Sequence, residues 1–244
     1  SLNDTINIMK LHRFYVHQMH NRFGPIELGH TVWIHDQPLL HQWLRVLRYN
    51  VGNQLILFNN TEERLYQISK IDGTVGVQVE LVTDMTRLLP KNKVYLLWSL
   101  LKNDKNDWVL QKATELGVHK LVPIIAKRTE KTFFDTERAQ KIITEATEQC
   151  GRADLPIIRE PIMLAEAIAE YKETPLLVCE QHNSTYVNLQ EQPAVALLVG
   201  PEGGWADEEK QLFTQYKLNY IAISAFTLRA ETAAILAVGL AASR

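Results

Sequence analysis

Two stretches in the last third of the chain, residues 197–205 and 228–234, most constrain what it can fold into. The first is an apolar, strand-like run that continues through the loop Gly200-Pro201-Glu202-Gly203-Gly204 into a predicted helix, and the second also leads into a helix. Glycines in this loop permit positive φ and close approach of a ligand to the backbone. Paired loops at the carboxyl ends of neighbouring strands are where open α/β sheets bind ligands. The sequence therefore predicts an α/β fold with a ligand site formed by two loops.

The charges around the first loop narrow the choice of ligand. Glu202 lies inside the loop, and the predicted helix after it opens with Asp207, Glu208 and Glu209. Carboxylates at a helix N-terminus suit the helix dipole, but they repel a phosphate that docks there. A neutral or cationic ligand therefore fits better. A dinucleotide enzyme is not favoured either, because no Gly-x-Gly-x-x-Gly follows the first strand of the α/β region.

Hydrophobic patterning divides the chain into two predicted domains. Residues 1–85 contain short β-rich runs at 32–34, 54–58, 65–68 and 75–81, with one helical stretch at about 38–48, and a small β-barrel is the natural closure for such strands. After a linker, residues 86–244 alternate strands at 94–100, 120–125, 176–179, 194–199 and 220–223 with helices at 104–116, 136–149, 164–171, 206–216 and 229–242. This alternation predicts a parallel sheet covered by helices.

Composition argues against several classes of protein. The 244 residues are 46% hydrophobic, but the longest apolar run, residues 233–242, is about half of what a membrane span needs. Cys150 and Cys179 lack metal-ligand spacing, which indicates reduced thiols and a cytoplasmic location. Six of the eight histidines fall within the first 41 residues, without a compact metal pattern. With a formal net charge of −2, any RNA binding needs a local patch. We expect no metal site and no membrane association.

Several motifs, taken in order along the chain, resemble one known family. They are Arg13-Phe14-Tyr15-Val16, Arg45-Val46-Leu47-Arg48 with Val51-Gly52, residues 111–118, residues 148–152 and the two stretches described first. Together they resemble the SPOUT class of S-adenosylmethionine-dependent RNA methyltransferases and, more closely, the 16S ribosomal RNA uracil-N3 methyltransferase family, RsmE. The resemblance covers nearly all of the chain.

The resemblance implies both architecture and partners. It implies a SPOUT-type C-terminal α/β domain with a deep trefoil knot, residues 86–244, preceded by a small PUA-like β-barrel domain that contacts RNA, residues 1–85. It also implies a homodimer that acts on 16S rRNA of the small ribosomal subunit. A small-residue face in the last helix would let helices approach closely in such a dimer, and it consists of Ala233, Ala234, Ala237, Gly239 and Ala242.

Methyl transfer from a sulfonium is an in-line displacement, so the enzyme must hold donor and acceptor in contact and alignment. Backbone amides and small side chains can grip the adenosine of S-adenosylmethionine, or of the product S-adenosylhomocysteine, without placing charge against the sulfonium. The predicted cofactor-binding residues are Leu177, Val178, Cys179, Val199, Gly200, Glu202, Gly203, Gly204, Ile223, Ser224, Thr227, Leu228 and Thr232. Taken alone, Gly203-Gly204 would indicate only a tight turn between a strand and a helix.

Arg229 and Glu231 are the predicted catalytic residues, because both belong to the first turn of an otherwise apolar helix and should lie at its mouth. Arg229 can position a phosphate or polarise a uracil carbonyl, and Glu231 can accept the N3 proton. The alternative is that Glu231 is an ordinary first-turn acid favoured by the helix dipole, with Arg229 as its ion-pair partner.

Five arginines are candidates for RNA contacts. Three of them, Arg13, Arg45 and Arg48, interleave with aromatic residues, as a single-stranded RNA platform requires, although aromatics in a small barrel also serve as core. Arg128 and Arg152 each follow a predicted element and suit phosphate contacts, whereas an isolated surface arginine is often only solvated.

Two positions depart from the family pattern, since Ser224 stands where the family has a glycine and Phe226 stands where it has a cation. Two alternatives to uracil-N3 methylation stay open. One is a SPOUT methyltransferase with another RNA acceptor, either a ribose 2′-oxygen or another base. The other is a non-catalytic RNA-binding factor in ribosome assembly.

Overall fold

The computed structural model describes residues 11–16, 27–73, 75–102, 104–130, 132–180 and 188–242. The chain divides into two compact units, Ser1–Leu88 with Thr147–Asp154, and Leu89–Ala146 with Leu155–Arg244. The second unit nearly coincides with the predicted C-terminal domain, but residues 147–154 return to the first unit, which the sequence does not predict. The domain limits of 1–85 and 86–244 stay a prediction.

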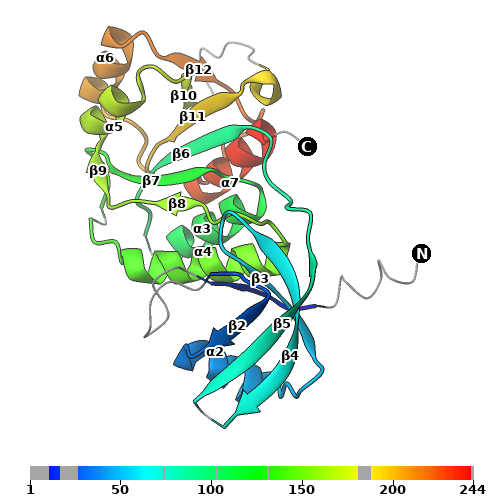
Figure 1. The fold of residues 1–244 in the computed structure, drawn as a ribbon. Coiled ribbons are helices and arrows are strands. Elements are labelled where there is room, and N and C mark those ends of the chain that lie inside the picture. The colour runs from blue at the N-terminus through cyan, green and yellow to red at the C-terminus, as the bar shows by residue number, and fades with distance from the viewer. Residues whose placement is uncertain are drawn as a thin grey trace. The chain divides into compact units, whose positions relative to one another are not determined.

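The first unit is a mixed five-stranded sheet in the order β1-β3-β4-β5-β2 (Figure 1). Its strands are β1 Arg13–Tyr15, β2 Thr31–Ile34, β3 Gln54–Phe58, β4 Glu63–Asp72 and β5 Gly76–Asp84. β1 pairs with β3 in parallel, and the other pairs are antiparallel. The four β-rich runs predicted in this region all fall on strands.

The helical stretch predicted at 38–48 consists of two pieces. The α-helix α2 spans Gln37–His41 and continues as the π-helix η1 at Gln42–Val46. Asp36 caps its start by accepting a hydrogen bond from the Leu39 amide at 2.9 Å, and Arg48, with φ of 55°, follows its end. Trp43 from η1 is fully buried in the core of this unit.

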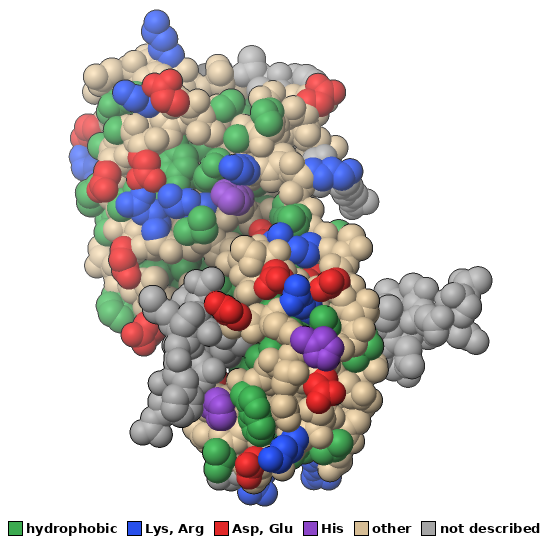
Figure 2. Space-filling view, in the orientation of Figure 1, with side chains coloured by type: hydrophobic (Ala, Val, Ile, Leu, Met, Phe, Trp, Pro, Cys, Tyr) green, Lys and Arg blue, Asp and Glu red, His purple; other side chains and the backbone are tan. Residues whose placement is uncertain are grey.

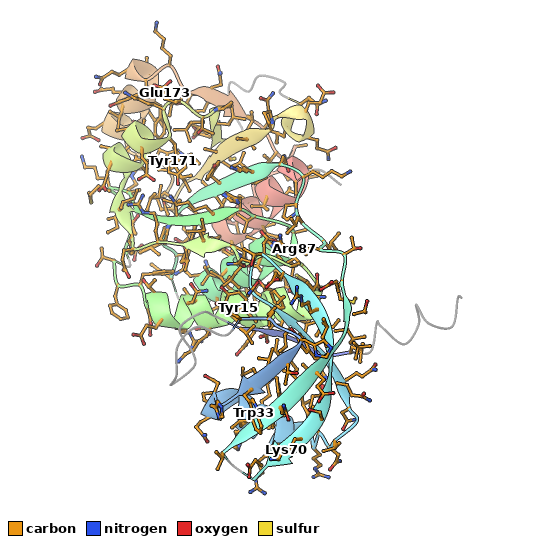
Figure 3. The ribbon with its side chains drawn as sticks, in the orientation of Figure 1. Tyr15, Trp33, Lys70, Arg87, Tyr171 and Glu173 are labelled. Carbon is orange, nitrogen blue, oxygen red and sulfur yellow. The ribbon has the colours of Figure 1, made fainter. Side chains whose placement is uncertain are left out.

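The outer face of this sheet carries a few aromatic residues. Trp33 stacks on His35 with ring centroids 5.8 Å apart, and the Lys70 ammonium lies 5.7 Å from the Trp33 ring centroid (Figure 3). The Trp33 ring therefore has two neighbours, His35 and Lys70, within this unit.

The second unit is a parallel seven-stranded sheet in the order β12-β10-β11-β6-β7-β8, with β9 also paired to β7. The strands are β6 Lys93–Ser99, β7 Lys120–Ile125, β8 Ile157–Ile158, β9 Ile162–Met163, β10 Leu176–Cys179, β11 Ala194–Val199 and β12 Asn219–Ile221. The parallel sheet expected from the βα alternation is confirmed, whereas the two-residue strands β8 and β9 are not predicted by it.

Helices cover both faces of this sheet (Figure 1). α3 Lys105–Glu115, α7 Ala230–Ala241 and the part of α4 Thr136–Cys150 within this unit pack on one face, and α5 Leu164–Tyr171 and α6 Asp207–Gln215 pack on the other. Alternate residues of one strand enter different cores: Leu197 belongs to the first and Leu198 to the second. The short 3₁₀-helix η2 at Leu189–Glu191 precedes β11.

The strand order contains a reversal that places the ligand site. From β6 the chain adds β7 on one side, and it later adds β11 on the other side of β6. Val199 at the end of β11 lies in register with Trp98 near the end of β6. Open α/β sheets bind ligands in the crevice outside the carboxyl ends of strands at such a reversal.

The α/β fold predicted from the sequence is confirmed, and the trefoil knot stays a prediction. Ala234 and Ala237, two residues of the predicted small-residue face of α7, are fully buried in the core of the second unit and are not available to a partner. A methyl group added at Gly239 would contact the Leu116 side chain of the same chain at 3.5 Å. Within the described ranges, no helix has the length and apolar character to span a membrane.

Candidate functional site

A cavity of about 600 Å³ lies in the second unit, at the reversal of strand order. Its walls come from the ends of β10 and β11, from the start of α3, and from the segment between β12 and α7. The residues that line it are Lys105, Cys179, Glu180, Val199, Gly200, Pro201, Glu202, Gly204, Trp205, Ile223, Ser224, Phe226, Thr227, Leu228, Arg229, Ala230 and Ala233. Its volume suits one small organic ligand, since ligand pockets range over roughly 300–1,000 Å³.

The three loop glycines serve different purposes. Gly204 has φ of 68°, a conformation that favours glycine, whereas neither Gly200 nor Gly203 has a positive φ. A Cβ on Gly200 would lie 2.9 Å from the buried Trp205 ring, so this glycine is required by packing. A Cβ on Gly203 would make only ordinary contacts, 3.5 Å from the Arg128 side chain. The positive φ that the loop glycines permit is therefore adopted by Gly204 and not by the other two.

A turn at residues 126–129 holds the glycine-rich loop in place. The buried Glu209 carboxylate accepts a hydrogen bond from the Lys127 amide at 2.7 Å and from the Ala206 amide at 2.7 Å. Arg128 donates from Nη1 to the carbonyl oxygen of Gly203 at 2.8 Å. These contacts fix both ends of the loop segment that precedes α6. The Arg128 guanidinium is therefore engaged with the loop.

The opposite wall of the cavity is the segment between β12 and α7. Ser224 Oγ accepts a hydrogen bond from the Phe226 amide at 3.0 Å, which makes a local turn. The Phe226 side chain is 79% exposed although it lines the cavity. At the end of β10, burial raises the pKa of the Cys179 thiol to about 12, so this lining group stays neutral.

Three charged side chains meet beside the cavity. Lys105 Nζ lies 3.0 Å from Glu202 Oε1 and 3.6 Å from Glu231 Oε2. The hydrogen bond to Glu202 raises the pKa of Lys105. Partial burial alone would raise the pKa of Glu202, but hydrogen bonds from backbone amides and from Lys105 lower it on balance. The cluster therefore holds one ammonium between two carboxylates.

Most of the predicted cofactor-binding residues line the cavity. Those that do are Cys179, Val199, Gly200, Glu202, Gly204, Ile223, Ser224, Thr227 and Leu228. Leu177 and Val178 are core residues of β10, while Gly203 and the exposed Thr232 lie outside the lining. The predicted wall at the end of β10 is thus made by Cys179 and Glu180.

The two predicted catalytic residues occupy different positions. Arg229 precedes α7 and lines the cavity with an exposed side chain. Glu231 lies in the first turn of α7 as expected, but it is buried and does not belong to the cavity lining. Its ion-pair partner is Lys105 and not Arg229.

The arginines proposed for RNA divide into engaged and exposed residues. Arg13 pairs with the buried Glu63, and the buried Arg152 pairs with Asp154 at 2.7 Å. Arg45 and Arg48 have exposed side chains. The aromatic residues Phe14 and Trp43 beside them are core and offer no stacking face. On the face seen in Figure 2, cationic and anionic side chains are interspersed.

Several lining residues were not predicted from the sequence: Lys105, Glu180, Pro201, Trp205, Ala230 and Ala233. A signal for Lys105 was present, since it follows the first strand of the predicted parallel sheet. Loops that leave the first strand flank the reversal of strand order in many open sheets.

Comparison with known proteins gives consistent matches. Residues 88–242 match the family of RNA methyltransferase domains. Ribosomal RNA small subunit methyltransferase E of Rickettsia conorii is 31% identical over 237 residues, which cover 94% of this chain and 94% of that protein.

Two solved structures also resemble the chain. A methyltransferase structure from Legionella pneumophila with bound SAM has a TM-score of 0.81 at 29% identity, covering 95% of this chain and 97% of that one. A ribosomal RNA small subunit methyltransferase E from Neisseria gonorrhoeae bound to S-adenosylmethionine has a TM-score of 0.80 at 24% identity, covering 93% and 95%.

Proposed function

The chain belongs to the ribosomal RNA small subunit methyltransferase E family, and we propose that it transfers a methyl group from S-adenosylmethionine to N3 of a uracil in 16S rRNA. The observation that carries the proposal is the cavity at the strand reversal, with walls made by the two predicted loops. Uracil N3 as the acceptor rests on the family resemblance.

The residues of the cavity fit the proposed cofactor. The lining charges of Lys105, Glu180, Glu202 and Arg229 sum to zero, so the site does not concentrate positive charge against a sulfonium. The backbone at Gly204 is open, since a Cβ there would have no neighbour within 4 Å. We propose that residues 199–204 and 223–228 hold the adenosine moiety, as apolar surface and backbone groups suit it. When bound, the cofactor supplies an electrophilic methyl group.

The chemistry of the acceptor is a displacement with loss of one proton. The N3 lone pair forms the new N–C bond, the C–S bond breaks, and its electron pair goes to sulfur. The protein must therefore hold N3 of the acceptor in line with the methyl carbon and the sulfur. We propose that Arg229, exposed at the cavity, contacts the RNA acceptor region.

RNA recruitment falls to the first unit in this proposal. Among the arginines that the structure describes in this unit, Arg45 and Arg48 have exposed side chains, so they are well placed to contact phosphates. Arg45→Ala combined with Arg48→Ala should weaken RNA binding and make its salt dependence shallower, with S-adenosylhomocysteine affinity unchanged. If RNA binding by the double variant has the same salt dependence as binding by the wild type, Arg45 and Arg48 do not contact RNA phosphates.

We also propose a cytoplasmic homodimer, on the family resemblance. Light scattering at micromolar protein concentration measures the assembly. A monomer there would reject the dimer and any site composed from two subunits.

The activity is tested by methyl transfer to small ribosomal subunits from a strain that lacks the endogenous enzyme. Tritiated S-adenosylmethionine reports the transfer, and nucleoside mass spectrometry identifies the product. We expect 3-methyluridine. A ribose-methylated nucleoside or another methylated base would assign a different acceptor, and tight subunit binding without any methylation would identify an assembly factor.

A further inference from the structure

Lys105 is a charged side chain of the cavity that lies outside the two sequence motifs, so neither motif assigns it a role. It is the first residue of α3 and follows β6, on the opposite side of the strand reversal from the loop after β11. Its side chain lines the cavity and is 31% exposed. A cation therefore faces the ligand space from a third segment of the chain.

The Lys105 ammonium is held by one carboxylate from the glycine-rich loop and one from α7. Glu202, from the glycine-rich loop, accepts a hydrogen bond from its Nζ at 3.0 Å, and Glu231, in α7, lies 3.6 Å away. The Glu231 side chain is only 10% exposed, and its Oε2 accepts no hydrogen bond from the part of the chain that the structure describes. An ionised carboxylate so buried requires a nearby cation, and Lys105 supplies it.

The protonation of Lys105 limits what it can do. An ammonium between two carboxylates is stabilised in its charged form, in agreement with the raised pKa of this side chain. Lys105 is therefore a hydrogen-bond donor and a fixed positive charge, and not a base. An ammonium has three N–H donors, so two carboxylate partners leave one for a ligand in the cavity.

A uracil acceptor needs such a donor. Loss of the N3 proton places negative charge on N3 and on the two carbonyl oxygens that flank it. A fixed donor aimed at one of these oxygens stabilises the anion without reorganisation at the moment of reaction. We propose, on the basis of the function proposed above, that Lys105 donates a hydrogen bond to a carbonyl oxygen of the acceptor base, and that Glu202 and Glu231 are positioning residues that hold its ammonium.

The proton balance follows from this assignment. The N3–H bond breaks and its proton passes to water, while the N3 lone pair forms the bond to the methyl carbon and sulfur takes the electron pair of the broken C–S bond. Glu231 keeps its charge for Lys105 and does not take the proton. This role differs from the general base that the sequence alone indicates for Glu231.

A competing role for Lys105 is binding of the cofactor's own carboxylate. Because two carboxylates already flank the ammonium, little net positive charge remains to attract a third full carboxylate, whereas the neutral carbonyl oxygen of a bound base needs only the remaining N–H donor.

The variant Lys105→Met tests the proposal, with Lys102→Met as its matched control. Lys102 is three residues away and pairs with Glu130, and its side chain does not line the cavity. Because Lys105→Met leaves Glu231 without its cation, the double variant Lys105→Met with Glu231→Gln removes the orphan charge and secures a folded sample. Thermal unfolding of all variants identifies those that fold.

Single-turnover methylation is measured on small subunits that carry either uracil or 5-fluorouracil, whose N3 proton is more acidic. We expect Lys105→Met, alone and in the double variant, to lose roughly 10²–10³-fold in rate on uracil, the cost of one lost oxyanion donor. The affinity for S-adenosylmethionine, measured by calorimetry, should change less than threefold, which corresponds to about 0.6 kcal/mol of binding free energy. The loss should shrink on 5-fluorouracil and at high pH, and Lys105→Arg should restore part of the rate.

Each other outcome separates the alternatives. A Lys105→Met sample that binds S-adenosylmethionine weakly and has the same 5-fluorouracil-to-uracil ratio as wild type would overturn the proposal in favour of a cofactor contact. Rates equal to those of Lys102→Met would overturn it outright. If the wild-type chain itself methylates no uracil, the proposed function fails, and that result is distinct from a failure of Lys105 alone.

Discussion

Gly200→Ala probes the packing that shapes the glycine-rich loop. The added methyl group would lie 2.9 Å from Cε2 and 3.1 Å from Nε1 of Trp205. The Trp205 ring is buried and packs edge-on against Phe213 at 5.1 Å, so it has little room to move. Because Trp205 also lines the cavity, a shift of the ring or of the loop changes the ligand wall.

The expected cost follows from overpacking. An extra methyl group in a packed site costs about 1–3 kcal/mol of unfolding free energy. For a chain of this size each kcal/mol lowers Tm by about 2–4 °C, so we expect a fall of roughly 2–12 °C. If the distorted cavity wall weakens the binding free energy of S-adenosylhomocysteine by about 1.4 kcal/mol, its affinity falls about tenfold.

Two neighbouring variants serve as controls. Gly203→Ala introduces contacts of 3.5 Å without a positive φ, so its Tm should match that of the wild type. Gly204→Ala meets no atom, but its φ of 68° should cost about 1–2 kcal/mol. Differential scanning fluorimetry and titration calorimetry measure all three. A Gly200→Ala protein with wild-type Tm and affinity, or Gly203→Ala as the most damaged variant, would refute this account of the loop.

Three further predictions follow from single side chains. Glu209→Gln should lower the unfolding free energy by about 1–3 kcal/mol in denaturant titration, because an amide cannot accept from both the Lys127 and Ala206 backbone amides as the carboxylate does. Phe226→Ala, at a 79% exposed residue on the cavity rim, should leave Tm and S-adenosylmethionine affinity unchanged. If Phe226 stacks on an RNA base, KM for the RNA should rise by roughly 5–160-fold, since one stacked base contributes about 1–3 kcal/mol. Between pH 9.0 and about 12 the unfolded chain releases a Cys179 proton that the folded chain retains, so stability falls as pH rises, and Cys179→Ala should show a smaller loss of Tm above pH 9.0.

The sequence predicts the architecture of the second unit because its elements carry local signals. Residues of β11 alternate between two cores, and α5 is found at the predicted residues 164–171. β8 and β9 carry no such signal, because each is only two residues long and pairs at the margin of the sheet. Ile223 was expected in a strand, but β12 ends at Ile221 and Ile223 lines the cavity instead.

Long-range contacts explain what the sequence could not predict in the first unit. Glu148 accepts a hydrogen bond from the Tyr15 amide at 2.8 Å, and the Arg152 carbonyl accepts one from Arg13 at 3.2 Å. Each bond joins residues more than 130 positions apart, and neither has a periodic pattern. Arg152 therefore has a structural role in this unit, and the RNA contact expected from its charge stays a prediction.

The start of α6 disfavours a phosphate for a different physical reason from the direct charge repulsion that the sequence suggests. The carboxylates at the start of α6 were expected to repel a phosphate directly, yet Glu209 is buried as an acceptor for backbone amides and Glu208 pairs with Lys127. Since the Ala206 amide at this helix start donates to Glu209, it is not available to an anion. The preference for an uncharged or cationic ligand therefore arises from a helix start occupied by its own side chain, and from the Glu202 carboxylate that remains in the cavity wall.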